Sequence, residues 1–213
     1  MTDTTETPLP PLSGRRAQAA RNDELILEAA RAVFVADPRA PITDVAKRAG
    51  VGISALYSRY GSKEELLRKL SRDGLQVYVD VTEAALADER DPGAVFVDRM
   101  RKLVEADTSS LTLALAGRFK PDKDLFALAE RANRLAREFF ERVKGVLRPG
   151  LAVHDLSLVL ELVAAIKVSD RERTMQLRRR FLAVILDGLR AAEERELPGP
   201  PPNWAELSER WVT

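Results

Sequence analysis

The sequence contains no cysteine and a single histidine, His154. The lack of cysteine excludes disulfides, thiolate metal sites and cysteine nucleophiles, and one imidazole is too few for a histidine-based metal cluster. Aromatic residues make up only 6% of the chain, which argues against a base-stacking platform. No nucleophile–base pair and no glycine-rich phosphate loop stands out, so we expect neither an enzyme nor a cofactor.

Excess charge and long hydrophobic runs are also missing. A net charge of +1 excludes a polycation that coats nucleic acid without specificity. The longest nearly apolar run, Leu156–Val168, has about 13 residues and contains Glu161, whereas a transmembrane span needs about 20. The N-terminal segment Met1–Leu12 is polar and proline-rich, unlike a secretory signal. We therefore expect a cytoplasmic protein with no membrane partner.

Helical periodicity runs through most of the chain, and no alternating strand pattern competes with it. Residues 1–14 lack periodicity and are typical of a disordered arm. Asn22 is placed to cap the first helix, which Pro38 ends. The sequence predicts an all-α fold. The expected helices after the first are Pro41–Ala49, Ile53–Tyr60, Lys63 to about Asp88, Pro92–Asp107, Ser109–Gly117, Pro121–Leu147, Asp155–Val168 and Arg171–Glu196.

One segment, Ile42–Leu67, has the pattern of a helix-turn-helix. Two short helices are joined by Ala49–Gly52, and in this motif the second helix enters the major groove of DNA. Lys63 begins the next helix, where its charge and the backbone N–H groups could engage a phosphate together. The residues expected to hold the two helices together are Val45, Ala46, Val51 and Leu56. The residues expected to face outward are Ile53, Ser54, Ala55, Tyr57, Ser58 and Arg59.

This segment resembles the DNA-binding domain of the TetR family of bacterial transcriptional regulators. The residues that carry the resemblance are Ala29-Ala30, Phe34, Val45-Ala46, Ala49–Val51, Leu56-Tyr57, Tyr60, Ser62–Glu64 and Leu66. The resemblance implies a homodimer that binds a palindromic double-stranded DNA operator and releases it when a small ligand enters the C-terminal domain. By position, Tyr57 and Lys63 resemble phosphate contacts. The groove-facing positions implied are Thr43, Ile53, Ser54, Ala55, Ser58 and Arg59. The segments similar to an actinobacterial branch are Arg21-Asn22, Ala40–Ile42 and Ala49–Gly52.

The chain departs from the family pattern in two ways. Gly52 stands where Ser or Thr often caps the recognition helix, and Arg59 is the only outward-facing side chain suited to bidentate base reading. Residues 1–70 carry 11 basic and 9 acidic side chains, so their net charge is only +2. The position of the charges therefore matters more than their sum. The basic residues expected around the reading helix are Lys47, Arg48, Arg59 and Lys63.

We divide the chain into a flexible arm (1–20), a helix-turn-helix domain (21–70), a helical regulatory and dimerisation domain (71–196) and a proline-rich tail (197–213). In the regulatory domain, the candidate contacts for a small hydrophobic effector are Phe96, Met100, Leu103, Leu111, Leu113, Phe119, Phe126, Leu135 and Phe139. The same residues could instead be plain core. The candidate dimer contacts on the last two long helices are Leu158, Leu162, Leu182, Ile185, Leu186 and Leu189.

Several single residues carry their own expectations. Arg15 and Arg16 are expected in a solvated arm or in the minor groove. We expect Arg178–Arg180 to form a solvated or dimer-rim face and His154 to lie at the surface. Glu161, an acid in an apolar helix, should meet an arginine, a ligand or solvent.

The proline-rich tail contains a second helix pattern. Asn203 and Glu206 have the spacing of a capping box, and Trp204, Leu207 and Trp211 share one helical face. This pattern predicts a short helix that docks on its own subunit or on a partner, and a frayed terminus is the alternative.

Taken together, these features favour a ligand-responsive transcriptional repressor. Two alternatives stay open: an α-helical carrier or metabolising protein without a DNA role, and an activator or ligand-independent regulator on the same fold.

Overall fold

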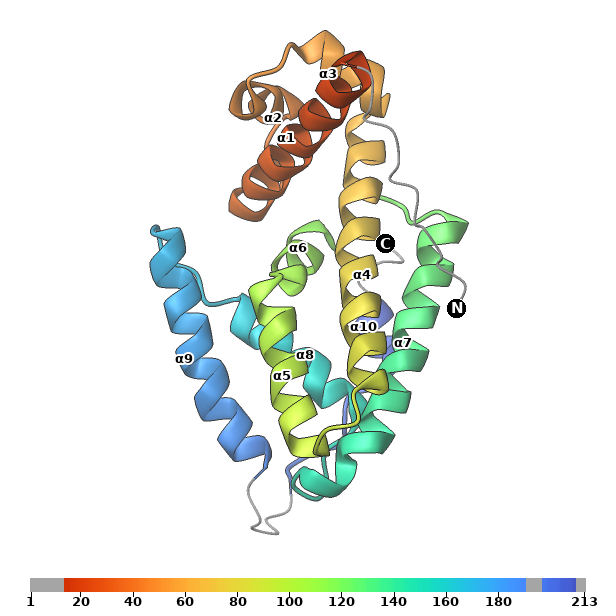
Figure 1. The fold of residues 1–213 in the computed structure, drawn as a ribbon, viewed down its shortest axis with the longest axis vertical. Helices are drawn as coiled ribbons and strands as arrows, with labels where there is room; N and C mark the ends of the chain where they lie inside the picture. The colour runs from red at the N-terminus through yellow and green to blue at the C-terminus, as the bar shows by residue number, and fades with distance from the viewer. Residues whose placement is uncertain (1–13, 191–196, 210–213) are drawn as a thin grey trace, which may run out of the picture.

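The computed structural model describes residues 14–190 and 197–209, and every regular element in those two ranges is helical (Figure 1). The all-α prediction is thus confirmed. The helices are α1 (Gly14–Ala36), α2 (Ile42–Ala49), α3 (Ile53–Tyr60), α4 (Lys63–Ala87), α5 (Pro92–Glu105), α6 (Thr108–Leu115), α7 (Lys123–Val143), α8 (Val153–Ala164), α9 (Arg171–Leu189) and α10 (Trp204–Glu209), with a 3₁₀ turn at Lys144–Val146. None of the described helices combines the length and hydrophobicity needed to cross a bilayer.

The helices form two parts that share the long helix α4. In Figure 1, α1, α2 and α3 lie together at one end around the start of α4, and α4 then runs alongside α7 into the larger part built with α5, α8 and α9. Each part has its own hydrophobic core. The first core contains Ile26, Phe34, Val45, Leu56 and Leu66, and the second contains Phe96, Met100, Phe139, Leu160 and Leu182.

Helix α6 belongs to the first core although it follows α5 in the chain. Its Leu111 and Leu115 are buried together with the residues of α1 and α2, and Phe119 and Leu125 join the same cluster. The end of the molecule that carries α1, α2 and α3 is therefore packed against the rest through both α4 and α6.

Some helix ends differ from the sequence predictions. Helix α1 begins at Gly14, so Asn22 lies inside it and does not cap it. Pro41 is the N-cap of α2 and not its first helical residue. Helix α8 begins at Val153, where the N–H of Ala152 donates to Asp155 (2.7 Å). It ends at Ala164, four residues before the predicted end. Helix α9 ends at Leu189, before the predicted end at Glu196. Residues 14–20 of the expected arm belong to α1, and arm residues 1–13 lie outside the described residues.

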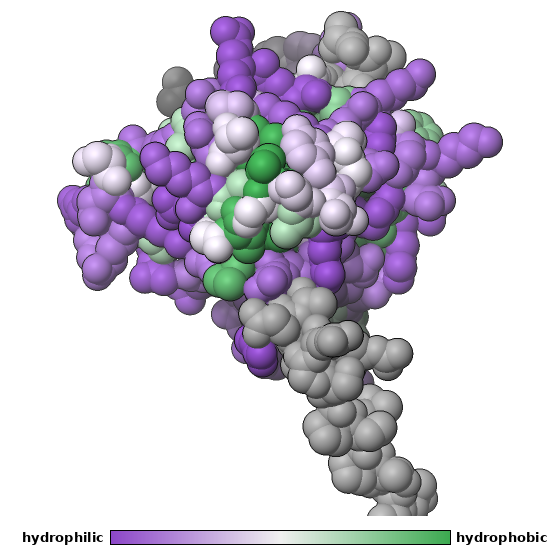
Figure 2. Space-filling model, turned by 90° about the horizontal axis from the view of Figure 1, so that it is seen from above, coloured by the Kyte–Doolittle hydropathy of each residue, from purple (hydrophilic) through white to green (hydrophobic). Residues whose placement is uncertain are grey.

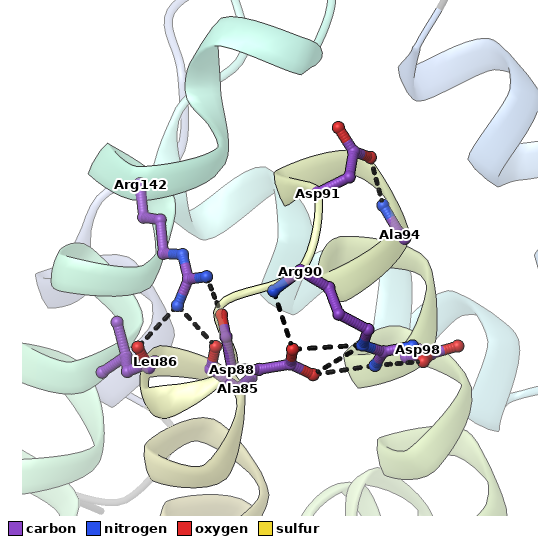
Figure 3. A network of polar contacts seen from close by, with 8 residues as sticks. All are labelled: Ala85, Leu86, Asp88, Arg90, Asp91, Ala94, Asp98 and Arg142. Atoms are coloured by element: carbon purple, nitrogen blue, oxygen red, sulfur yellow. Dashed lines mark hydrogen bonds and ion pairs between the residues drawn. The ribbon is translucent and has the colours of Figure 1, made fainter.

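A network of hydrogen bonds and ion pairs surrounds the loop between α4 and α5 (Figure 3). Arg142 of α7 reaches across and donates to the carbonyls of Ala85 (2.8 Å), Leu86 (2.5 Å) and Asp88 at the end of α4. Arg90 pairs with Asp88 (2.7 Å) and Asp98 (2.6 Å). The hydrogen bonds from Arg90 lower the pKa of Asp88 to about 2. These contacts attach the lower end of α4 to both α5 and α7.

Candidate nucleic-acid interface

Helices α2 and α3 form the predicted helix-turn-helix. Gly50 ends α2 in a left-handed conformation (φ 68°), and its N–H donates to the carbonyls of Ala46 and Lys47. A side chain at this position would be strained because L-residues rarely adopt positive φ. Gly52 then precedes α3 in an extended conformation without a side-chain cap. The turn expected from the sequence is confirmed.

Helix α3 has one buried side and one open side. Leu56 is fully buried and Tyr60 nearly so, while Tyr57 is 45% exposed and Ile53 is 37% exposed. Figure 2 looks down on the end that carries these helices and shows a small hydrophobic area bordered by polar side chains. The predicted groove-facing and phosphate-contacting residues that are exposed are Thr43, Ile53, Ser54, Ala55, Tyr57, Ser58 and Arg59. These residues are therefore open to solvent.

Arg59 is held at this surface by an acid from α1. Its Nε donates to Asp23 (2.9 Å), and the hydroxyl of Tyr60 donates to the same carboxylate oxygen. Burial alone would raise the pKa of Asp23, but the bonds from Arg59 and Tyr60 outweigh it, and the pKa is lowered. Burial and this carboxylate raise the pKa of Tyr60. Nothing in the local sequence marks Asp23 as this partner, because it lies 36 positions from Arg59.

Lys63 lies at the start of α4 as predicted, but its ammonium already has contacts. Nζ donates to the carbonyl of Ala40 (2.6 Å) and lies 5.0 Å from the centroid of the Phe34 ring. Ser62 caps α4 by accepting from the N–H of Glu65 (3.1 Å). A phosphate at this helix terminus would therefore compete with Ala40 for Lys63.

The candidate effector contacts do not form one set. Leu111 and Phe119 lie in the first core, whereas Phe96, Met100, Leu103 and Phe139 are buried in the second. Leu113 and Leu135 are half-buried. Phe126 is 60% exposed, so its prediction as a pocket residue is wrong: it lies on the outer face of α7.

A small cavity opens at the junction of α5 and α6. Its volume is about 10 Å³, room for about one water molecule. The residues that line it are Leu103, Val104, Asp107, Ser109, Leu160, Val163, Ala164 and Arg178. Of the predicted effector contacts, only Leu103 lines it.

The predicted dimer contacts need a similar correction. Leu182, Leu186 and Leu189 of α9 are buried inside the subunit, because they point toward α5 and α8. Ile185 is partly buried against the same core, while Leu158 and Leu162 of α8 are exposed. The exposed apolar side chains of α9 are instead Phe181 (48%) and Val184 (62%). Helical phase could have found them, since Phe181 and Val184 lie away from Leu182 and Leu186.

Two residues expected at the surface are buried. Arg178 is 4% exposed and donates to Asp107 (2.6 Å) and to the carbonyls of Ala164 and Ile166. His154 is 5% exposed, because α10 covers it: the rings of His154 and Trp204 stack with centroids 6.1 Å apart. Glu161 is half-buried and so reaches solvent, one of the three expected outcomes.

The tail helix α10 docks on its own subunit. The N–H of Glu206 donates to the Asn203 side chain (3.1 Å), and the N–H of Asn203 donates to Glu206 (2.8 Å), which confirms the capping box. Trp204 Nε1 donates to Glu130 of α7 (3.1 Å). Trp211 lies outside the described residues.

Comparison with known proteins agrees with this geometry. Residues 26–70 match the model of bacterial regulatory proteins of the tetR family. The chain is 28% identical to a TetR transcription regulatory protein from Mycobacterium vanbaalenii, with a TM-score of 0.52 over 83% of this chain and 99% of that one. It is 25% identical to SCO0520, a TetR transcriptional regulator from Streptomyces coelicolor, with a TM-score of 0.51 over 80% and 99% of the two chains.

A third solved structure shows the fold alone. The TetR-like regulator LfrR from Mycobacterium smegmatis, in complex with proflavine, is 22% identical, with a TM-score of 0.57 over 76% of this chain and 95% of that one. No curated protein matches the sequence. Residues 26–70 are therefore similar to the DNA-binding domain of bacterial regulatory proteins of the tetR family, and the chain shares the overall fold of TetR transcriptional regulators.

Proposed function

We propose that a homodimer of this chain is a ligand-responsive transcriptional repressor, which binds a palindromic operator in the cytoplasm and leaves it when a small hydrophobic effector binds the regulatory part. The observation that carries the proposal is the open side of α3, where exposed residues surround a helix anchored by buried Leu56. Ser54, Ala55 and Arg59 then meet base edges, and Tyr57 and Lys63 contact phosphates.

The contacts between the two parts supply a route for the effector signal. Leu111 and Leu115 of α6 pack in the core beneath the reading helices. Lys167, in the turn between α8 and α9, donates to the carbonyls of Val35 (3.0 Å) and Ala36 (3.4 Å) at the end of α1. A shift of α6 or of this turn would therefore move α1 and, with it, the orientation of α3.

A DNA-binding measurement tests the proposal directly. DNA from the region upstream of the protein's own gene should contain a protected inverted repeat, detected by footprinting and by fluorescence anisotropy. Tyr57→Ala should weaken operator binding about tenfold, since a phosphate hydrogen bond is lost. Phe126→Ala is the control, because Phe126 is also an exposed aromatic residue but lies on α7. Protection without two-fold symmetry, or equal affinity of the two variants, would contradict this assignment.

A further inference from the structure

The second core contains a buried arginine whose charge is not neutralised by the described residues. Arg99 of α5 is 3% exposed. Its guanidinium carbon lies 4.5 Å from the centroid of the Phe139 ring and 5.0 Å from that of Tyr78. Its Nε (3.2 Å) and Nη2 (3.0 Å) both donate to the hydroxyl of Thr82. Arg99 of α5 is thus contacted from both α4 and α7.

These partners use only part of the hydrogen-bonding capacity of Arg99. A guanidinium has five N–H donors, and two of them share one hydroxyl oxygen here. The Thr82 hydroxyl donates its own hydrogen to the carbonyl of Tyr78 (2.7 Å), so it meets Arg99 as an acceptor. No carboxylate of residues 21–190 or 197–209 lies within ion-pair distance of Arg99. Asp98, its neighbour in sequence, pairs with Arg90 instead.

Arg178 shows how the same subunit neutralises a buried arginine when the role is structural. It is as buried as Arg99, yet it has Asp107 as a counter-ion and two backbone carbonyls as further acceptors. A buried charge without a counter-ion is costly, and contacts with two aromatic rings offset only part of that cost. A methionine at position 99 would fill the space without the penalty. The charge is therefore expected to serve a partner that arrives from outside.

The surroundings of Arg99 define the chemistry of that partner. Thr82 and the two rings leave N–H donors of the guanidinium unused, and a guanidinium matches a carboxylate in a bidentate pair. Phe96, Met100 and Leu103 on the same helix are apolar and buried, so the rest of the ligand must be apolar. Tyr78, one of the two rings against Arg99, is only half-buried.

We infer that Arg99 is the anchor for the carboxylate of an effector with an apolar body. The inference rests on the ligand response proposed above and specifies its chemistry. The bound carboxylate would join α5 to α4 through Thr82 and Tyr78, and α4 continues to the reading end.

Thermal shifts of the full chain with matched probes test the inference. Hexanoate and phenylacetate should raise the melting temperature of the wild type, whereas hexanamide and phenylacetamide, which lack the charge, should not. Arg99→Met should abolish the carboxylate shift. Without ligand it should melt about 2–4 °C higher, because an uncompensated buried charge is removed. Arg101→Met, at an exposed position of the same helix, should behave as the wild type.

Three results would overturn the inference: no carboxylate stabilises the wild type, Arg99→Met keeps the shift, or Arg99→Met melts no higher than the wild type. Arg99→Lys gives a binding test that does not depend on how Arg99→Met folds. It keeps the charge but loses the bidentate edge, so carboxylate binding by calorimetry should weaken at least tenfold, and unchanged binding would overturn the site. Operator binding without probes tests the proposed function separately. Carboxylates that bind without releasing operator would refute the ligand response and leave the site intact.

Discussion

Three consecutive arginines in α9 have three different environments, although they are the same residue type. Arg178 is buried with Asp107, Arg179 pairs at the surface with Glu105 (2.6 Å), and Arg180 is exposed. The expectation of one solvated cluster is therefore wrong for Arg178. Helical phase places Arg178 on the buried face with Leu182. Its counter-ion Asp107 is 71 positions away, and no sequence pattern indicates a pair so far apart in the chain.

The contrast between Arg178 and Arg179 can be measured. Arg178→Met leaves the Asp107 carboxylate and two carbonyls without their donor, so the free energy of unfolding should fall by about 3 kcal/mol. The lower end of the usual range applies because the Asp107 side chain is 33% exposed. Arg179→Met breaks an exposed pair that solvent screens, so its effect on the free energy of unfolding should be much smaller than that of Arg178→Met. Urea denaturation gives both values, and equal losses would contradict this account.

Arg59 is the residue on which sequence-specific reading depends most. Arg59→Ala should cost roughly 1–3 kcal/mol of binding free energy at one base pair per half-site. Asp23→Ala keeps the guanidinium but removes the carboxylate that holds its Nε, so it should weaken discrimination at the same base pair by a smaller amount. Competition with single-base operator variants measures both. A loss that is uniform over all operator positions would assign Arg59 to phosphate.

At the scale of elements, the sequence indicates best those helix ends that depend on contacts between residues close together in the chain. Ser62 caps α4, Gly50 ends α2 and Asn203 caps α10, each through contacts within a few residues. The start of α1 at Gly14 was not predicted, because no repeat of large apolar side chains begins before Leu25. The docking of α10 was predicted from the tryptophans alone. Its partners Glu130 and His154 depend on how α7 and α8 pack, which the sequence does not show.

The docked tail should respond to pH through His154. Burial and the nearby Arg137 lower the pKa of His154, while Asp155 opposes them, so the docked state favours the neutral ring. An undocked His154 binds a proton more readily, and docking is therefore favoured above the ordinary histidine pKa of about 6.5 and lost as pH falls below it. Between pH 7.5 and 5.5, Trp204 emission should shift to the red, measured with Trp211→Phe as background.

His154→Gln provides the control for this titration. It keeps a polar side chain under Trp204 but cannot be protonated, so its emission should not change between pH 7.5 and 5.5. Glu130, the other partner of Trp204, is left unchanged in this variant. The same red shift in His154→Gln would show that another group controls docking.

At the scale of the whole molecule, helix phase decides which apolar residues serve the core and which remain for a partner subunit. Successive residues of a helix are about 100° apart, so Phe181, Val184 and Gly188 share one flank of α9, and Ala183 and Asp187 share another. The first flank is apolar and exposed. Helix α8 adds the exposed Leu158 and Leu162. The sequence assigned the proposed dimer interface to α8 and α9, but it did not show which faces of these helices pack in the subunit's own core.

This arrangement predicts the effect of one charge on assembly. Val184 is 62% exposed, so Val184→Glu should leave the subunit folded, but in a dimer the carboxylate would be buried in an apolar contact. The dissociation constant of the dimer should rise roughly a hundredfold, which corresponds to about 3 kcal/mol. The affinity for a palindromic operator should fall to the affinity for a half-site.

Ala183→Glu adds the same charge on the polar flank and is the matched control for assembly. It should sediment as the wild type does, with both variants giving the wild-type circular dichroism spectrum. Leu189→Glu could not serve this purpose, because Leu189 is 7% exposed and its replacement would disrupt the subunit's own core. If Val184→Glu and Ala183→Glu sediment alike, or if the wild type is a monomer at micromolar concentration, the flank of Phe181 and Val184 is not the dimer interface.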